Sequence, residues 1–486
     1  MSDVHQARRS ARGDRSRRGR LAPLVVLALA GGEACSESSL DEAVPSASPS
    51  SSSEGGTLPA MDTSSPTTAA LDEESGEPPP SDDPRLCIDP CRLTLPVDWI
   101  YEGTPPPPPE EGQGNEPPND DPVPPLGSEF DPEGHLVPAM LRDPSDGSLI
   151  LGEERRGTAS LHRLDRHGRL QWNVPLPLPC DVCELTDITR HPSGDLLLSA
   201  SGLLLDQGHG LIAARYDPID HTVVWATTTP FPTPSFVTGR SGEIAALSNG
   251  AVAQLYLAGI GFSASQQILL ASYDTEGSLL EQVILLQDQA MEIRYPLIAR
   301  TLVGGDLLVS VPWGSSEIAF GRTAHLAPPL WNLALELFHP APLDDAQPDA
   351  RGHTIELGHA FDGTHTHLVL ADREGLEPEP RWVATLALDS TTGRRAALAL
   401  GPDAEPYAAA RTTPALGEQA GPLVGLSLAR WTTNGELRWH TTLLDRLDDS
   451  ENPVEIVIDD DEGIIFATVI DDRLRVERRT QRCTCE

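Results

Sequence analysis

The sequence predicts an all-β protein whose last three-quarters, residues 133–486, form a single β-propeller of about seven four-stranded blades. Three observations support this prediction: a turn followed by a short apolar strand recurs, a hairpin recurs, and the hairpins return at intervals of roughly 40 to 65 residues. No convincing helical pattern competes. Repeats of this size with four strands each are typical of propellers. Six or eight blades also fit the length. A pair of Greek-key sandwiches is the structural alternative, but it would not explain one hairpin recurring at a regular interval.

The first repeated unit is a turn that leads into a brief apolar strand. Its copies are Asp146–Gly152, Ser193–Ser199, Gly304–Ser310, Asp362–Leu370 and Glu462–Thr468. Glycine supplies the positive φ that reverses the chain, and the apolar run that follows is typical of a buried strand.

The second repeated unit is a hairpin. Its copies are Leu161–Trp172, Ala214–Trp225, Ser272–Leu280, Ala387–Gly393 and Leu428–Trp439, with a degenerate copy near Leu326–Leu333. Asp and Gly at the ends of a four-residue turn provide the side-chain hydrogen bond and the positive φ that the reversal needs. After the first turn, Leu170, Trp172 and Val174 alternate with polar residues. This period of two indicates a strand with one buried face.

The hairpin that ends in tryptophan resembles the PQQ-like (quinoprotein-type) propeller repeat, whose consensus is Leu-Asp-x-x-x-Gly-x-x-x-Trp. The turn Asp389–Gly393 matches the turn of this repeat but lacks the tryptophan, whereas Leu164–Trp172 has the tryptophan after a shorter turn. The resemblance covers most of residues 140–480. It implies that tryptophans dock neighbouring blades, and the residues expected in this role are Trp172, Trp225 and Trp439.

The N-terminus, residues 1–34, has the order of a secretory signal peptide. Seven arginines between Arg8 and Arg20 precede the apolar run Leu21–Ala30, which is too short for a comfortable membrane span. Cys35 follows a small residue at the end of this run, and it resembles the lipid-attachment site of bacterial lipoproteins. Gly32 and Glu33 depart from that family's motif, so export without a lipid remains the alternative.

Residues 35–132 are predicted to be a disordered linker rich in Ser, Pro and acidic residues. Twenty-one of the 46 prolines lie between Pro45 and Pro132. Proline removes hydrogen-bond donors and acidic residues repel one another, so this segment cannot bury enough surface to fold. Residues 85–101 interrupt it with two cysteines and an apolar run, and we expect this segment to dock on the folded domain.

Apart from Cys35, six cysteines remain, and they form three close pairs. These disulfide candidates are Cys87, Cys91, Cys180, Cys183, Cys483 and Cys485. An even number of cysteines in an exported chain favours disulfides, and we expect some of these to staple the closure of the ring and to hold residues 85–101 against it. A zinc site or a redox dithiol at Cys180 and Cys183 are the alternatives.

Four of the 14 histidines lie close together in the sequence. They are His353, His359, His365 and His367. His365 and His367 would face the same way on a strand, so a shared metal is one hypothesis and a solvated, turn-rich segment is the other.

The net charge of −38 excludes nucleic acid as a partner, because the chain would repel phosphates. The sequence contains no nucleophile elbow, His-Glu-x-x-His motif, phosphate loop or dinucleotide fingerprint.

Together these observations favour a monomeric, extracytoplasmic, non-enzymatic binding or scaffold module. We expect it to reside in the outer membrane or at the cell surface, with secretion or the periplasm as the alternative. Its only link to the membrane would be the lipid, its partner a protein or glycan of the cell envelope, and it would need no cofactor. The alternative function is an exported propeller enzyme, either a quinoprotein-like dehydrogenase or a glycan-active protein, that uses PQQ or a metal in its central channel.

Overall fold

The computed structural model describes these residues: 92–103, 135–136, 139–155, 157–204, 208–230, 236–260, 266–288, 298–302, 307–313, 316–322, 332–335, 343–361, 365–375, 377, 379–388, 396–412, 424–447, 454–470 and 473–484. All of them lie within residues 76–486, one of two compact units of the chain. Every regular element among the described residues is a β-strand. They include no helix long and apolar enough to cross a membrane.

Six antiparallel sheets have four strands each. The first in chain order comprises β8 (Cys180–Arg190), β9 (Leu196–Leu204), β10 (Gly208–Asp217) and β11 (Thr222–Pro230). The second comprises β12 (Phe236–Ala246), β13 (Val252–Ile260), β14 (Gln266–Tyr273) and β15 (Leu279–Asp288). The third comprises β16 (Ile298–Thr301), β17 (Leu307–Trp313), β18 (Ser316–Arg322) and β19 (Asn332–Leu335). The next two comprise β20 (Leu343–Pro348), β21 (His353–Phe361), β22 (Thr366–Glu374) and β23 (Trp382–Leu388); and β24 (Ala396–Leu400), β25 (Pro406–Thr412), β26 (Val424–Trp431) and β27 (Leu437–Leu447). The sixth comprises β28 (Glu455–Ile458), β29 (Ile464–Ile470), β30 (Arg473–Arg479) and β2 (Val97–Glu102).

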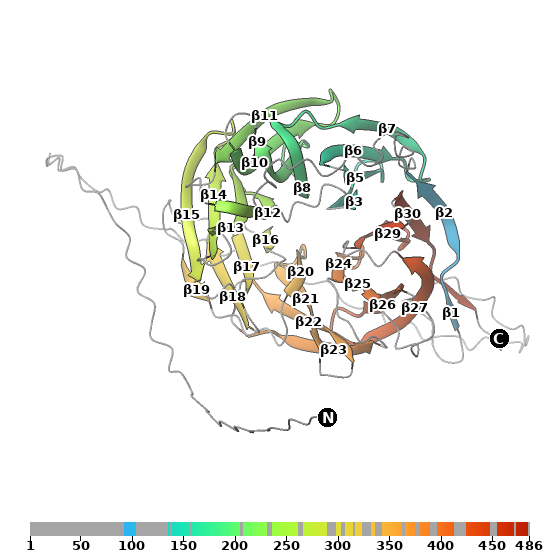
Figure 1. Ribbon diagram of the computed structural model, residues 1–486. Helices are drawn as coiled ribbons and strands as arrows, with labels where there is room; N and C mark the ends of the chain where they lie inside the picture. Colours follow the sequence, from blue (N-terminus) through green and yellow to red (C-terminus); the bar gives the residue numbers. More distant parts are fainter. Residues whose placement is uncertain are drawn as a thin grey trace, which may run out of the picture. The chain divides into compact units, whose positions relative to one another are not determined.

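A five-stranded sheet stands beside these six. It contains β3 (His135–Leu136), β4 (Met140–Arg142), β5 (Leu149–Arg155), β6 (Thr158–Leu164) and β7 (Leu170–Pro175), with both β3 and β4 paired to β5. The strands nearest the centre contact one another in the order β4, β8, β12, β16, β20, β24 and β28, and β28 contacts β4 again. Figure 1 shows the sheets around a common centre, with β11, β15, β23 and β27 at the outer edge. The predicted all-β propeller is therefore confirmed with six four-stranded blades, whereas the count of about seven stays a prediction.

A strand from the N-terminal side completes the last of the six sheets. β2 pairs with β30, and the short strand β1 (Arg92–Thr94) pairs with β31 (Arg482–Thr484). Arg478 on β30 also forms an ion pair with Asp98 on β2. The part of residues 85–101 that the structure describes thus contributes strands to the folded domain (Figure 1, β2 beside β30).

The turns form for the reasons that the sequence suggested. Asp165 Oδ1 accepts the backbone N–H groups of His167 at 2.8 Å and Arg169 at 2.9 Å, and Gly168 has a φ of 74°. Asp274 makes the same pair of bonds before β15, to the N–H groups of Glu276 and Ser278. A short polar side chain and a glycine therefore set each reversal.

Two of the predicted repeat copies connect different strands from the other copies of the same repeat. Ala387–Gly393 leaves β23 toward β24, so it connects two sheets and is not a hairpin within one. Asp362–Leu370 joins the second and third strands of its sheet, whereas Ser193–Ser199 joins the first and second. The same Asp and Gly residues in the sequence thus occur at different connections, so this local pattern alone does not fix the position in the repeat. The copy near Leu326–Leu333 falls mostly outside the described residues.

Apolar clusters fill the spaces between neighbouring sheets. At the closure of the ring, Leu149 and Leu164 of the five-stranded sheet pack with Val469 and Val476 of the last sheet. All four side chains are at most 2% exposed. Because each sheet buries its apolar faces only against its neighbours, the ring must close to shelter both ends of the array.

Candidate functional site: the central cavity

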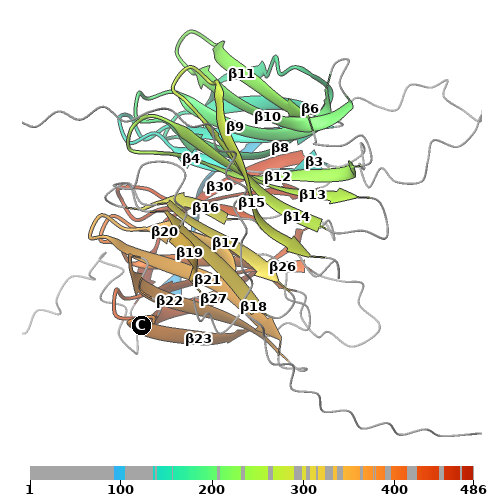
Figure 2. The same cartoon turned by 90° about the vertical axis from the view of Figure 1, so that its left-hand side faces the viewer.

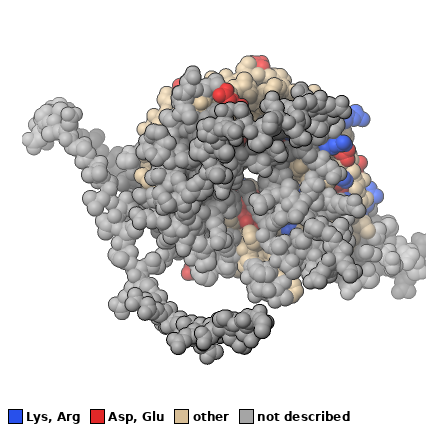
Figure 3. All heavy atoms as spheres, viewed as in Figure 1, with Lys and Arg blue, Asp and Glu red and all other residues tan. Residues whose placement is uncertain are grey.

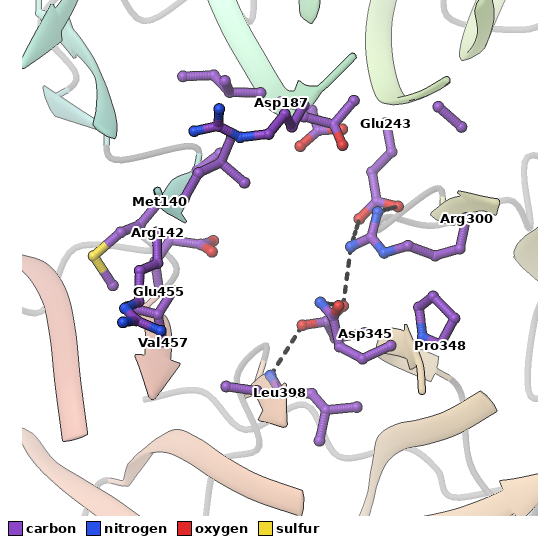
Figure 4. Close-up of a pocket in the computed structure, with 18 of the residues that line it drawn as sticks. Met140, Arg142, Asp187, Glu243, Arg300, Asp345, Pro348, Leu398, Glu455 and Val457 are labelled. Atoms are coloured by element: carbon purple, nitrogen blue, oxygen red, sulfur yellow. Dashed lines mark hydrogen bonds and ion pairs between the residues drawn. The ribbon is translucent and has the colours of Figure 1, made fainter. Parts of the chain in front are cut away.

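The inner strands enclose a cavity of about 490 Å³. Such a volume lies in the range of sites for small ligands. Its lining includes charged side chains, among them Arg142, Asp187, Glu243, Arg300, Asp345 and Glu455. Figure 4 shows Arg300 between Glu243 and Asp345 on one side of the cavity and Arg142 on the other.

Three of the acids reach the cavity at irregular points of their strands. The register of β8 shifts between Leu185 and Asp187, that of β12 shifts across Glu243, and that of β20 shifts just before Asp345. A bulge adds a residue to one strand and re-aims the side chains next to it. These irregularities therefore help to direct the three carboxylates toward the cavity.

Each of these carboxylates binds the backbone of another inner strand. The three bonds run from the N–H of Ile244 to Asp187 Oδ2 (2.9 Å), from the N–H of Ala299 to Glu243 Oε2 (2.8 Å), and from the N–H of Leu398 to Asp345 Oδ2 (2.9 Å). Hydrogen bonds to charged groups contribute more than neutral ones. The acids thus join the first strands of neighbouring sheets.

Arg300 connects two of these carboxylates. Its guanidinium forms ion pairs with Glu243 and with Asp345, the latter at 3.1 Å, and its Nε donates to the carbonyl of Ala346 at 2.8 Å. Burial by itself would lower the pKa of Arg300, but the carboxylates of Glu243, Asp345 and Asp187 outweigh it and raise this pKa. Arg300 is therefore a fixed cation at the joint between three sheets.

Two further arginines that line the cavity are paired as well. Arg142 Nη1 donates to Asp460 at 2.8 Å, and Arg190 forms an ion pair of 3.2 Å with Asp143. The hydrogen bond to Asp460 is the main reason that the pKa of Arg142 is raised. The charged groups of the cavity thus engage one another and the backbone.

PQQ does not fit this set of residues. It is a tricarboxylate and needs donors that are free to bind its anionic groups, whereas the Arg300 guanidinium is held by Glu243, Asp345 and Ala346. Several lining side chains are themselves carboxylates, which would repel it. We therefore derive no reaction step through PQQ.

The histidine cluster does not assemble a metal site. His353 pairs with Asp372 at 3.2 Å, and His359 Nδ1 lies 2.6 Å from Asp344. His365 precedes β22, which begins at Thr366, whereas His367 lies on it. No three His, Cys, Asp or Glu side chains converge as ligands among the described residues, which include all four histidines. Individual acids on neighbouring strands take up His353 and His359 as separate pairs, and a metal shared by these histidines stays a prediction.

One predicted cysteine pair forms a disulfide. Cys180 and Cys183 are bonded, with their Cα atoms 5.7 Å apart. This bond lies within one strand, so these two cysteines do not staple the ring; at the closure, β2 pairs with β30 and the last sheet packs on the five-stranded sheet. Cys483 lies on β31 opposite Leu93 of β1. Four further predicted positions fall outside the described residues: Cys35, Cys87, Cys91 and Cys485.

The predicted tryptophans lie at contacts between sheets. Trp225 of β11 lies against Gly277, and a Cβ on this glycine would be 2.5 Å from the indole ring. The Trp172 ring meets His221 edge-on at 4.9 Å, and Trp439 Nε1 donates to Gln481 at 3.1 Å.

Two tryptophans that were not predicted make the same contact with a glycine. Trp99 lies against Gly168, and Trp382 lies against Gly435, where a Cβ would be 2.6 Å from the ring. In each case the tryptophan is on the outer strand of one sheet and the glycine is in the last turn of the next.

The sequence interpretation missed the acids and Arg300 of the cavity. Asp187, Glu243 and Asp345 each lie within the first strand of a sheet and precede small or apolar residues. A carboxylate directly before a small or apolar residue in the first strand of a repeat is therefore the signal that could have identified them.

No protein-family model matches the chain, and no curated protein is similar to it in sequence. Solved structures are similar in fold. One from a study of two prolyl endopeptidases is 8% identical, with a TM-score of 0.42 over 73% of this chain and 50% of that chain. This chain therefore spans about half the length of that protein. The WD40 domain of SCAP from fission yeast is 7% identical, with a TM-score of 0.37 over 80% of this chain and 98% of that one. TolB from Acinetobacter baumannii is 12% identical, with a TM-score of 0.35 over 64% and 63%. These likenesses concern the fold alone.

Proposed function

We propose that this protein is an exported, lipid-anchored β-propeller that acts as a non-enzymatic binding or scaffold module for a partner in the cell envelope. In this proposal the five-stranded sheet is a seventh blade of the PQQ-like type. Cys35 carries the lipid, and residues 35–132 are a tether. The signal-like order of residues 1–34, the composition of the linker and the ring of sheets support it.

One observation carries the non-enzymatic part of the proposal. The acids Asp187, Glu243 and Asp345 accept backbone N–H groups of neighbouring inner strands, and Arg300 binds two of these acids. Side chains that hold the scaffold together in this way are poorly placed to move protons or attack a substrate. We therefore assign recognition of a protein or glycan partner to the loop faces and outer edges of the propeller.

An enzyme remains the second candidate, because carboxylates and arginines do converge on the central cavity. In that case the protein would be a glycan-active enzyme. Turnover of a glycan panel that is lost in Glu243→Gln while the variant stays folded would replace the binding proposal with this one.

Export and anchoring are tested by the intact mass of protein recovered from cells. The proposal expects a chain that starts at Cys35 and carries the extra mass of attached acyl groups. A full-length chain that begins at Met1 would reject export, and a shortened chain without acyl mass would reject the anchor. Six free thiols in the exported form would reject structural disulfides.

A further inference from the structure

Exposed apolar side chains gather on the outer edge of two neighbouring sheets. Ten large apolar side chains are exposed among the described residues, and five of them lie on β11, on β15 or in the turn before β11. These five are Ile219 (82% exposed), Val224 (52%), Leu279 (44%), Leu280 (59%) and Ile284 (51%). We call them the apolar edge. Scattered apolar residues need no explanation, but a gathering of them marks an interaction surface.

The two strands of the apolar edge meet in space. Trp225 of β11 packs on Gly277 in the turn from which β15 begins, and the Thr227 hydroxyl donates to the carbonyl of Gly277. Arg215 donates to the carbonyl of Thr275 in the same turn at 3.4 Å. Figures 1 and 2 both show β11 and β15 on the outside of neighbouring sheets. The turn before β15 therefore lies directly against β10 and β11 of the neighbouring sheet.

The backbone of β15 is open on one side. In the described part of the chain β15 pairs with β14 alone, and it is the last strand of its sheet. Its ten residues contain no proline or arginine, and its only charged residues are Glu281 and Asp288. Of the other outer strands, β7 ends at Pro175, β11 ends at Pro230 and β27 contains Arg438, whereas β23 contains no proline or arginine either.

This surface is acidic. Asp220 and Glu276 are exposed, and Glu281 is half-buried. The arginines of these two sheets whose side chains are described are paired, Arg190 with Asp143 and Arg215 with Asp195. Figure 3 shows acidic side chains over β11, whereas arginines gather over β2 and β30. A second copy of this chain, with its net charge of −38, would be repelled here.

The chain itself gives a precedent for adding a strand to a sheet of this propeller. β2 fills the outer position beside β30 although it lies more than 350 residues earlier in the sequence. A peptide that pairs with an open edge gains affinity from its main chain and specificity from alternate side chains.

We propose that the apolar edge binds an extended segment of another protein, in which apolar and basic residues alternate and which adds a strand beside β15. This inference rests on the proposed binding function and names the chemistry of its partner. The apolar side chains of the segment would cover Leu280 and Ile284, and its basic side chains would face the acids nearby.

The test uses the exported chain and a labelled ten-residue peptide of alternating valine and arginine, with binding followed by fluorescence anisotropy. A peptide of the same composition, with its valines and arginines in two separate blocks, controls for charge alone. We expect the alternating peptide to bind more tightly than the block peptide and to slow amide hydrogen exchange in β15.

Two variants locate the site. Leu280→Ser combined with Ile284→Ser should weaken binding of the alternating peptide at least about tenfold, because two buried apolar contacts are lost. Val383→Ser removes an equally exposed residue from the outer strand β23, and it should leave binding unchanged. Both changes are on the surface, and the thermal midpoint checks that each variant is folded.

Equal binding of the two peptides, or exchange slowed outside β15, would overturn the inference. A concentration-dependent dimer that the Leu280 and Ile284 substitutions abolish would assign the edge to a second copy instead. These results leave the export and activity measurements untouched, so the docking site can fail while the proposed function stands.

Discussion

Neighbouring sheets of this propeller meet in two regions, near the centre through their first strands and at the outer edge through their last strands. Near the centre the contacts are ionic and polar: Asp187, Glu243 and Asp345 bind backbone N–H groups, and Arg300 bridges two of the acids. At the outer edge the contacts are steric, and an indole ring lies against a glycine of the next sheet.

The two kinds of contact respond to different perturbations. A buried ion pair is costly to break because the remaining charge loses its partner, and it depends on pH. A ring that fits against a glycine has no charge to titrate, but it leaves no room for a methyl group. We therefore expect the inner contacts to be sensitive to pH and loss of charge, and the outer contacts to be sensitive to volume.

Removal of the bridging cation should have the largest effect. Arg300→Met leaves Glu243 and Asp345, which are 6% and 8% exposed, without their counter-ion. The free energy of unfolding should fall by about 3–5 kcal/mol at pH 7. Denaturant unfolding of the variant and the wild type measures this difference.

Arg351→Met is the matched control. Arg351 pairs with Asp349 in its own turn, and its side chain is 47% exposed. We expect this substitution to cost less than about 1 kcal/mol. Equal losses for the two variants would show that the inner ionic contacts are ordinary surface pairs, and the comparison of the two regions would then be wrong.

At the outer edge, Gly277→Ala should have the next largest effect. Gly277 has a φ of 82°, and its new Cβ would lie 2.5 Å from the Trp225 ring. Strain in the left-handed region costs about 1–2 kcal/mol and overpacking about 1–3 kcal/mol, so we expect a total loss of about 2–5 kcal/mol.

Gly352→Ala separates the two causes. Gly352 has a φ of 91°, and nothing lies within 4 Å of the position of its Cβ. Unfolding of this variant should report the backbone strain alone, a loss of about 1–2 kcal/mol. If both alanine variants lose the same free energy, the contact with Trp225 contributes nothing.

The outer region was far easier to predict than the inner one. The Asp–Gly turns and the tryptophans of the hairpins are local sequence patterns. The same short segments therefore predicted the strands, the turns between them and the tryptophans Trp172 and Trp225. The repeat also predicted the all-β propeller, because strands of this period cannot bury their apolar faces singly.

The cavity depended on features that a local pattern does not contain. Irregular register before Asp345 and around Glu243 decides that these acids face the centre, and periodicity does not reveal such a shift. Arg300 meets its acids only when sheets more than 40 residues apart come together. Likewise, β22 begins after His365, so the predicted pair of histidines on one strand did not form.

Loss of the Cys180–Cys183 bond should lower the free energy of unfolding by less than Arg300→Met or Gly277→Ala does. The bond closes a very short loop within β8 and links no two sheets. The chain-entropy model gives about 2 kcal/mol for such a loop, against about 5–6 kcal/mol for a bond that closes the whole ring. Unfolding of the Cys180→Ser, Cys183→Ser variant measures it, and a loss near the larger value would mean that this bond supports the inner contacts as well.

The smallest effect is a pH dependence at His359. Its hydrogen bond with Asp344 raises the pKa of His359 against the opposing effect of burial, and Asp344 is 2% exposed beside Asp345. A raised pKa in the folded state means that the stabilisation is complete below the pKa of the unfolded histidine, about 6.5, and is lost as the pH rises through the folded value. The free energy of unfolding of the wild type, compared with His359→Gln, should therefore be larger by on the order of 1 kcal/mol at pH 5.5, as for other partly exposed ion pairs. The difference should vanish at pH 9.

The loss caused by Gly277→Ala should be the same at both pH values, because no titrating group takes part in the contact with Trp225. A Gly277→Ala loss that changed with pH as much as the His359 difference would mean that the inner and outer contacts are coupled, and that the ring responds to pH as a whole.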